Sequence, residues 1–355
     1  MRGKGSASVG SREARGLLSG TAGVVAFSLT LVATRAAEPA FGALTVGAGR
    51  AVLAAGLAVA LLRRRGLPLL PPDGRVATIV IAATVVVGFP LLTSWALADV
   101  PVAHAAVVVG LAPAATAGFA VVLAGERPAP PYWAALGVGL AAVLAFAVVQ
   151  GAGRPRLADL LVLAAVVLVG LGYAEGGLLA RRVDGAVVIC WALLAALPVT
   201  VPLAAAGLAA HPPRHVTVGA AAGLGYVSVV SMFLGFVVWY RGLALGGVAR
   251  VGRLQLAQPV LTLAWAALLL GEPLTPLGAG TAMIVLASVG LGRHGVHRGR
   301  RTGAGARRPS AGRRCRVLRG AHRGWGRVCP AGRQADMQEG FPGHDFDGSN
   351  PETRP

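Results

Sequence analysis

Two ionisable residues, Arg50 and Glu175, lie inside long apolar runs of this 355-residue sequence, where an unpaired charge is costly. Arg50 is about nine residues into the run 41–62, and its guanidinium could hold a substrate carboxylate or phosphate in a bidentate fork. The alternative is a structural pair with a carboxylate or with helix carbonyl groups. Glu175 could exchange a proton, because a carboxyl group in apolar surroundings can titrate near neutral pH. The alternative is an ion pair with Arg181 or Arg182 at the end of the same run.

A second group of polar residues precedes a proline in the run 248–270. Arg253, Gln255 and Gln258 come before Pro259, which removes a backbone donor and disfavours a continuous helix. Carriers expose backbone and polar groups to substrate where a helix breaks near the middle of the membrane. We therefore expect Gln258, the deepest of the three, to contact substrate, with Gln255 as a further candidate. Arg253 either binds substrate or only marks the inner boundary of the membrane.

Two carboxylates, Glu126 and Glu272, follow the glycines that end two apolar runs. Both lie near the expected membrane surface, where the helix dipole favours a carboxylate at the N-terminus of the next helix. We therefore expect a structural role for both. The sequence contains no H-E-x-x-H, G-x-S-x-G or G-x(4)-G-K-[ST] pattern and no paired Cys/His set. We expect no catalytic residues, no metal site and no cofactor.

Composition places these residues in a membrane protein. The chain is 55% hydrophobic and 13% charged, with a mean hydropathy of +0.67, whereas soluble domains carry about 25% charged residues. Residues 1–292 hold 19 basic and 9 acidic residues, and residues 293–355 hold 14 basic and 5 acidic residues. A long apolar block with a short basic tail excludes an ordinary soluble enzyme, a disulfide-stapled secreted domain and a DNA-binding protein with a charged core.

The apolar block divides into segments of about 20 residues, the length that crosses a bilayer as a helix. None alternates polar and apolar residues with the period of two that a barrel strand requires. We predict an all-α integral membrane protein with ten transmembrane helices, at about 17–34, 41–62, 77–97, 102–124, 132–150, 158–180, 186–208, 218–240, 248–270 and 276–292. The first run is long for the apolar core of a signal peptide, so we expect it to remain as a span.

Basic residues in the connections orient these spans, because cytoplasmic loops carry an excess of Lys and Arg. With the N-terminus inside, the cytoplasmic side receives 14 of these residues before the tail is counted, and the outer side receives 4. We therefore predict an N-in, C-in topology with an even number of spans. Trp239 and Tyr240 close one span at the predicted inner face, and we interpret them as part of an interfacial aromatic belt.

An internal repeat relates the two halves of the block. Residues 97–130 and 243–276 share 11 of 34 residues without a gap, at a fixed offset of 146. Pro113 aligns with Pro259, and we expect each to break its helix. The offset corresponds to an odd number of spans, so the halves have opposite orientations. Inverted-topology repeats are typical of secondary transporters, whose halves rock around a central site; a duplicated scaffold is the alternative.

At these residues the sequence resembles the EamA-like branch of the drug/metabolite transporter superfamily. The resemblance rests on two P-x(12)-E runs ending in LAGERPAP and LLLGEPLTP, on GAGRAVLAAGLAVALLRRR (47–65), and on VARVGRLQLAQPVLTL. It covers about residues 17–292. It implies two inverted five-helix repeats and a secondary carrier, often an exporter of amino acids or other metabolites, that has no ATPase site.

The predicted organisation has five parts. A basic cytoplasmic N-terminus (1–16) precedes the first EamA-like repeat (17–150), and a linker (151–157) leads to the second (158–292). The Arg-rich tail (293–355) is expected to be disordered in the cytoplasm. Its arginine clusters could bind anionic lipid, whereas its pattern does not support nucleic-acid binding.

These features favour a secondary active transporter of the plasma membrane that exports amino acids or related small metabolites by alternating access, with protons as the candidate coupling ion. Its expected partners are a small-molecule substrate and the lipid bilayer. One chain holds both halves, so a monomer suffices, and a homodimer is the alternative. A lipid-handling protein and a non-transporting membrane scaffold are the alternative functions, and a scaffold would leave Arg50 and Glu175 unexplained.

Overall fold

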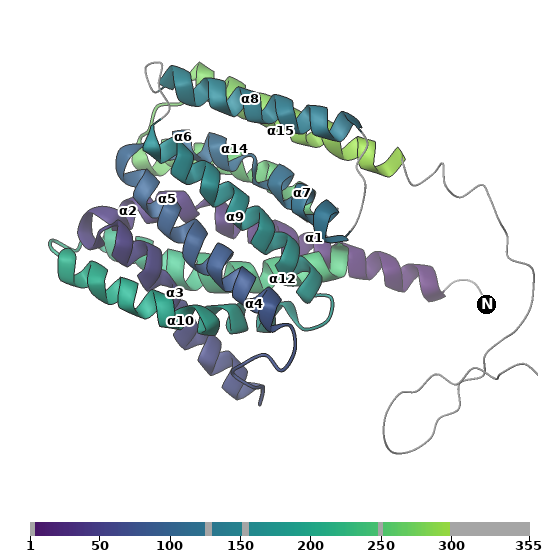
Figure 1. Cartoon of the computed structure of the whole chain (residues 1–355), viewed down its shortest axis with the longest axis horizontal. Coiled ribbons are helices and arrows are strands. Elements are labelled where there is room, and N and C mark those ends of the chain that lie inside the picture. Colours follow the sequence, from purple (N-terminus) through teal and green to yellow (C-terminus); the bar gives the residue numbers. More distant parts are fainter. Residues whose placement is uncertain (1–3, 125–129, 151–155, 248–250, 299–355) are drawn as a thin grey trace, which may run out of the picture. The chain divides into compact units, whose positions relative to one another are not determined.

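The computed structural model describes residues 4–124, 130–150, 156–247 and 251–298, which form helices and short connections without a strand (Figure 1). The first half (residues 4–150) contains α1 (Lys4–Ser28), α2 (Thr30–Phe41), α3 (Ala43–Arg64), α4 (Arg75–Ile81), η1 (Ala82–Gly88), α5 (Phe89–Asp99), α6 (Val102–Val109), α7 (Ala112–Ala124) and α8 (Pro130–Gln150). The second half (residues 156–298) contains α9 (Leu157–Leu179), α10 (Gly185–Ala210), α11 (Val218–Gly225), η2 (Tyr226–Gly235), α12 (Phe236–Gly246), η3 (Gly252–Ala257), α14 (Gln258–Leu270) and α15 (Pro276–Arg298).

Seven segments of the described chain are long and apolar enough to cross a bilayer, and each coincides with a predicted span. They are Glu13–Phe41, Ala43–Arg64, Arg75–Asp99, Val102–Leu123, Leu157–Leu179, Gly185–Ala210 and Val218–Gly246. Three shorter apolar helices, Gly137–Phe146, Leu254–Leu270 and Pro276–Ser288, lie where the remaining spans are predicted. The all-helical membrane fold is therefore confirmed, whereas the count of ten spans and the N-in, C-in topology stay predictions.

Several of these segments are interrupted helices. Leu29 separates α1 from α2, and η1 and η2 are π-helical stretches within 75–99 and 218–246. Both π-helical stretches end in glycine followed by phenylalanine, at Gly88 and at Gly235. π-helical turns are frequent at functional sites. The shared distortion therefore makes η1 and η2 candidate functional segments at equivalent positions of the two halves.

Each helix contact between the two halves has an equivalent contact in which the two halves change roles. α1 of the first half packs against α12 of the second, and α9 of the second half packs against α5 of the first. α3 packs against α10, and α8 lies along α15, as Figure 1 shows. Replacing each segment by its counterpart in the other half reproduces the same set of contacts. Two repeats related by a pseudo-two-fold axis produce this arrangement.

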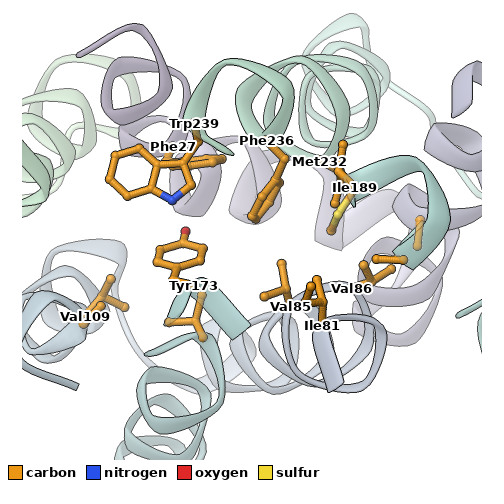
Figure 2. Packing of buried hydrophobic residues seen from close by; sticks show 14 of the residues in the cluster. Phe27, Ile81, Val85, Val86, Val109, Tyr173, Ile189, Met232, Phe236 and Trp239 are labelled. Atoms are coloured by element: carbon orange, nitrogen blue, oxygen red, sulfur yellow. The ribbon is translucent and has the colours of Figure 1, made fainter. Parts of the chain in front are cut away.

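A cluster of aromatic rings joins the halves in the core (Figure 2). Phe27 of α1 meets Phe236 of α12 with ring centroids 4.8 Å apart, and Tyr173 of α9 meets Trp239 of α12 at 5.7 Å. Trp239 and Tyr240 are fully buried. Their assignment to an interfacial belt is therefore wrong, because these large rings bury their area against other rings rather than at the membrane surface.

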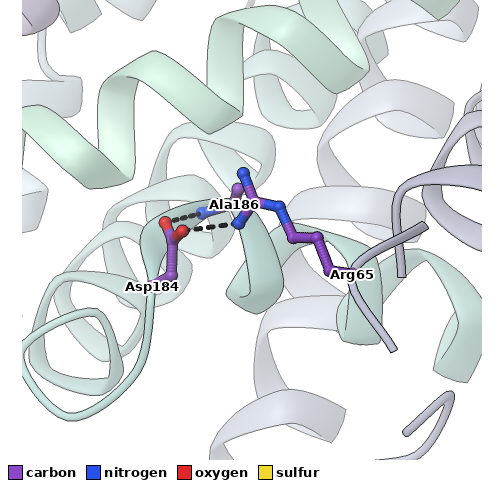
Figure 3. Close-up of polar contacts among 3 residues, drawn as sticks. All are labelled: Arg65, Asp184 and Ala186. Carbon is purple, nitrogen blue, oxygen red and sulfur yellow. Dashed lines mark hydrogen bonds and ion pairs between the residues drawn. The ribbon is translucent and has the colours of Figure 1, made fainter. Parts of the chain in front are cut away.

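An exposed ion pair connects the end of α3 to the start of α10 (Figure 3). Arg65 Nη1 lies 2.6 Å from Asp184 Oδ2, and Asp184 Oδ1 accepts the Ala186 N–H at 3.0 Å, so Asp184 caps α10. Partial burial acts to raise the pKa of Asp184, but the Ala186 N–H and the Arg65 guanidinium outweigh it and hold that pKa below its ordinary value. The pair ties the corresponding helices α3 and α10 together at one end.

Candidate functional site

Polar side chains from both halves surround the break between α1 and α2. Thr30 Oγ1 and Ser231 Oγ of η2 are 2.8 Å apart. Thr262 Oγ1 of α14 donates to the Ser28 carbonyl at 2.8 Å, and Trp265 Nε1 donates to Ser28 Oγ at 3.1 Å. Trp265 is half-buried and the other four are buried. We name these five residues the break cluster.

The break supplies backbone acceptors to this cluster. Carbonyl groups at the end of a helix lack the partners that a continuous helix would provide. The Ser28 carbonyl accepts from Thr262, and the Ala26 carbonyl accepts from the Tyr226 hydroxyl of η2 at 3.0 Å. Both donors belong to the second half. Sequence reasoning missed this cluster, because isolated Ser and Thr residues carry little signal; the alignment of Thr262 with Thr116 in the repeat was the one pointer to it.

Arg50 is buried within α3, with 1% of its surface exposed. Its Nε donates to the Val46 carbonyl of the same helix at 3.0 Å, and its Nη2 donates to Ser94 Oγ of α5 at 2.8 Å. Within the described ranges, no acidic side chain forms an ion pair with it. The bond to the Val46 carbonyl is one of the contacts expected if Arg50 has a structural role rather than a substrate-binding one. The guanidinium charge itself is not balanced by a carboxylate there, and this suits it to hold an anionic group.

The polar residues before Pro259 differ in burial within the protein. Gln255 in η3 is buried, with 2% exposure, and its Oε1 has no hydrogen-bond partner in the part of the chain that is described. Gln258, the preferred substrate contact, is half-buried at the start of α14. Gln255 is covered because η3 packs against α1 and α7. The side chain of Arg253 lies outside the described structure.

Glu175 is half-buried in α9, two residues after Tyr173 of the aromatic cluster. Among the described residues it forms no ion pair with Arg181 or Arg182, the partners in the structural alternative. Both arginines follow the end of α9 at Leu179 and lie in a turn. Glu175 is therefore a carboxyl group at the edge of the core that these two arginines do not neutralise.

Glu272 caps a helix, although not the helix that follows it. Its Oε1 and Oε2 accept the N–H groups of Val102 and Ala103 at 2.9 and 2.8 Å. These donors open α6 in the first half, whereas the prediction was the next helix, α15. The dipole of α6 stabilises the carboxylate in the same way. Glu126, its counterpart in the repeat, lies outside the described residues.

The two aligned prolines stand at helix interruptions. Pro113 lies in the first turn of α7, after Gly110 and Leu111 have separated α7 from α6. Pro259 lies in the first turn of α14, directly after the 3-10 helix η3. A first turn tolerates proline because its N–H groups have no intrahelical partner.

A buried pair of ionisable side chains joins α6 to α9. His104 Nε2 lies 2.5 Å from Asp159 Oδ1, and the two side chains are 6% and 7% exposed. Asp159 Oδ2 accepts the Arg156 N–H at 2.8 Å in the first turn of α9. The imidazole also lies against the ring of Phe146, with centroids 4.8 Å apart. Sequence reasoning did not single out this pair, because its members are 55 positions apart and match no motif.

A cavity of about 200 Å³ is lined by His104 of this pair and also by Arg156, Phe146 and Glu272. Of the predicted residues, Glu272 lines this cavity, whereas the described candidates for substrate binding and proton coupling lie elsewhere, on α3, η3, α9 and the start of α14. No hydrogen bond between described residues joins Arg50, Gln255 and Glu175 to one another. In the ranges that the structure covers, no group of three His, Cys, Asp or Glu side chains could hold a metal ion. The hydroxyl, imidazole and carboxyl groups where the two halves meet can form hydrogen bonds and exchange protons.

The chain matches the model of the EamA-like transporter family twice, over residues 14–148 and 156–292. It is 44% identical to the uncharacterized transporter YdeK of Bacillus subtilis (strain 168) over 261 residues, which cover 72% of this chain and 89% of that protein. It is 30% identical to a "probable terminal-alkyne amino-acid exporter" of Streptantibioticus cattleyicolor over 268 residues, covering 73% and 86% of the two chains.

A protein of known crystal structure, 18% identical in sequence, superposes with a TM-score of 0.58 and covers 78% of this chain and 97% of its own. At this level of identity the likeness shows a shared fold alone. The two family matches coincide with the two halves of the structure, whose helices make equivalent contacts with each other.

Proposed function

The chain belongs to the EamA-like transporter family, and we propose that it is a secondary active transporter that exports amino acids or related small metabolites by alternating access. It is a multi-pass protein of the cell membrane. One observation carries the proposal: hydrogen bonds join η2 and α14 of the second half to the break between α1 and α2 of the first. Two inverted repeats that rock against each other must remake such contacts whenever access changes sides.

Arg50 supports a substrate that carries a carboxylate. A buried guanidinium forms strong charge-assisted bonds with carboxylates, and the relative at 30% identity is named for amino-acid export. We propose that Arg50 binds the carboxylate, and that Gln255 Oε1, buried without a partner among described residues, accepts a hydrogen bond from the substrate. Gln258 and Arg253 are further candidates on the same interrupted segment.

Glu175 is the proposed site of proton coupling. Its half-buried carboxyl group lies on α9, a helix that contacts α5 and α7 of the other half. Rocking of the halves would change the solvation of this group, and a carboxyl group binds a proton more readily as it is desolvated. Proton entry could in this way accompany substrate export.

Flux into sealed vesicles tests both parts of the proposal. Labelled amino acids and small organic ions are offered to the reconstituted full chain under an imposed pH gradient. We expect gradient-driven flux in the wild type, and we expect Glu175→Gln to lose the gradient response while still exchanging substrate. Asp99→Asn, which alters an exposed carboxylate at the end of α5, is the matched control and should behave as wild type.

The outcomes separate the classes of function. Absence of flux for every solute would contradict a carrier and favour a lipid-handling or scaffold protein. An unchanged gradient response in Glu175→Gln would remove the proton role and leave the carrier standing. We also propose the N-in, C-in topology, with the Arg-rich tail bound to anionic lipid. Removal of residues 301–355 is then expected to weaken binding to anionic vesicles and to spare transport; equal binding would contradict the lipid role.

A further inference from the structure

We propose that His104 and Asp159 form a proton-binding site that joins the two halves at the N-terminal end of α6, and that a bound proton favours the arrangement seen here, in which α6 and α9 are in contact. The inference rests on the proposed function in one respect, since alternating access requires the halves to separate at this end. The coupling role proposed for Glu175 is independent of it.

The geometry makes the contact between the halves depend on one titratable ring. Asp159 Oδ2 accepts the Arg156 N–H within the second half, so this bond does not involve the first half. Asp159 Oδ1 has its partner in the first half, His104 Nε2 at 2.5 Å. The pair is more than nine-tenths buried, and His104 borders the cavity of about 200 Å³.

The charge of the ring changes the strength of this contact. Imidazole ordinarily gains or loses its charge between about pH 5 and 8. With an imidazolium, the contact is a charge-assisted bond that balances the buried carboxylate, roughly twice as strong as a neutral hydrogen bond. With a neutral ring, the carboxylate remains buried without a counter-charge from His104, which is costly. When the halves separate, water solvates both groups, and the charge of the ring no longer affects the contact. Low pH should therefore favour the arrangement in which His104 and Asp159 are in contact.

The charged groups around the pair come from three directions. Arg156 borders the cavity from the start of α9, and Glu272, after α14, has both oxygens bound to N–H groups of α6. α5 ends at the exposed Asp99, and α2 carries Arg35 and Glu38, of which Arg35 donates to the Leu97 carbonyl. α14 and α15 as far as residue 292 carry no ionisable side chain, and α8 carries only Tyr132. Because other carboxylates lie near α6, a test must change the titration of His104 alone.

A cysteine reporter in the cavity provides such a test. Ala103→Cys places a thiol in the cavity lining beside His104 and keeps the backbone N–H that Glu272 accepts. Its alkylation rate by a maleimide is measured between about pH 5.5 and pH 8, in the reconstituted full chain without substrate, with Cys315 and Cys329 replaced by serine. The same reporter is then measured with His104→Gln, whose amide can still donate to Asp159 but cannot titrate. Dividing the two rates at each pH removes the pH dependence that both thiols share. The charge of His104 itself would raise the thiolate fraction at low pH, which is opposite to the change that the proposal expects.

The proposal requires this rate ratio to depend on pH. We expect the rate with His104, relative to His104→Gln, to rise about fivefold or more from pH 5.5 to pH 8, the usual range of coupling between two sites. His215→Asn, which alters an exposed histidine between α10 and α11, should keep the full dependence. A ratio that stays constant across the pH range would overturn the proposal.

A second measurement covers the case in which His104→Gln does not fold. The ring nitrogens of His104 are followed by NMR through a pH titration, in the wild type and in Asp159→Asn. The proposal expects Asp159→Asn to shift the titration of this ring, and identical curves would overturn it. Neither experiment needs a substrate, so failure of the transport proposal in the flux assay is distinguishable from failure of this one.

Discussion

Glu272→Gln tests whether the contact between the halves at the start of α6 stabilises the fold. The carboxylate accepts two backbone N–H groups at 2.9 and 2.8 Å and lies at the positive end of the α6 dipole. Glutamine keeps one acceptor oxygen, so one N–H loses its partner in a partly buried site and the attraction between charge and dipole disappears. A hydrogen bond to a charged group contributes about 1.5–3 kcal/mol, and the dipole about 0.3–1 kcal/mol. We therefore expect a loss of roughly 2–3 kcal/mol.

The assay is thermal unfolding of the purified chain in a mild detergent, followed by its helical circular dichroism. For a chain longer than 250 residues, 1 kcal/mol corresponds to about 2 °C in Tm, so Glu272→Gln should lower Tm by roughly 4–6 °C. The control is Asp184→Asn at the N-terminus of α10, where the side chain is 49% exposed and asparagine can still cap the helix. Its expected loss is below about 1 kcal/mol. Equal Tm values for the two variants would refute the reasoning.

Arg50→Lys keeps the positive charge but loses the planar fork, so the substrate KM in the vesicle assay should rise about tenfold, equivalent to about 1.4 kcal/mol; an unchanged KM would exclude a carboxylate contact. Gly223→Ala would place a methyl group 2.5 Å from the Ala33 carbonyl oxygen and should therefore lower Tm. Gly219→Ala is the control and should leave Tm unchanged, because its methyl group would have its nearest neighbour at 3.9 Å. Equal effects on Tm would contradict close packing at α11. The pKa of Asp184 is lowered in the folded chain, so its contribution is complete above the ordinary carboxyl range and is lost as pH falls through the lowered value. The stability difference between wild type and Asp184→Ala should therefore shrink below about pH 4, and a constant difference down to pH 2 would count against the ionised carboxylate.

Hydropathy and the internal repeat were enough to predict the helical membrane fold, and the resemblance of the P-x(12)-E runs and of residues 47–65 to EamA-like proteins indicated the family. Each span is decided by its own 20 or so residues, because a polar backbone in lipid must be satisfied within the segment. The repeat needed no structure either, since residues 97–130 and 243–276 align on the page. Arg50 could likewise be expected to be buried, because it lies too far inside an apolar run to reach water easily.

The partners of the polar residues were decided by the tertiary structure alone. Glu272 accepts from α6 rather than from the helix that follows it, and Gln255 is more buried than Gln258 because neighbouring helices cover η3. His104 meets Asp159 only because α6 of one half lies against α9 of the other. Local sequence determines whether a segment enters the membrane, since that depends on its own composition. A hydrogen bond or an ion pair depends instead on where a second, distant segment is placed, and that placement is the result of packing the whole chain.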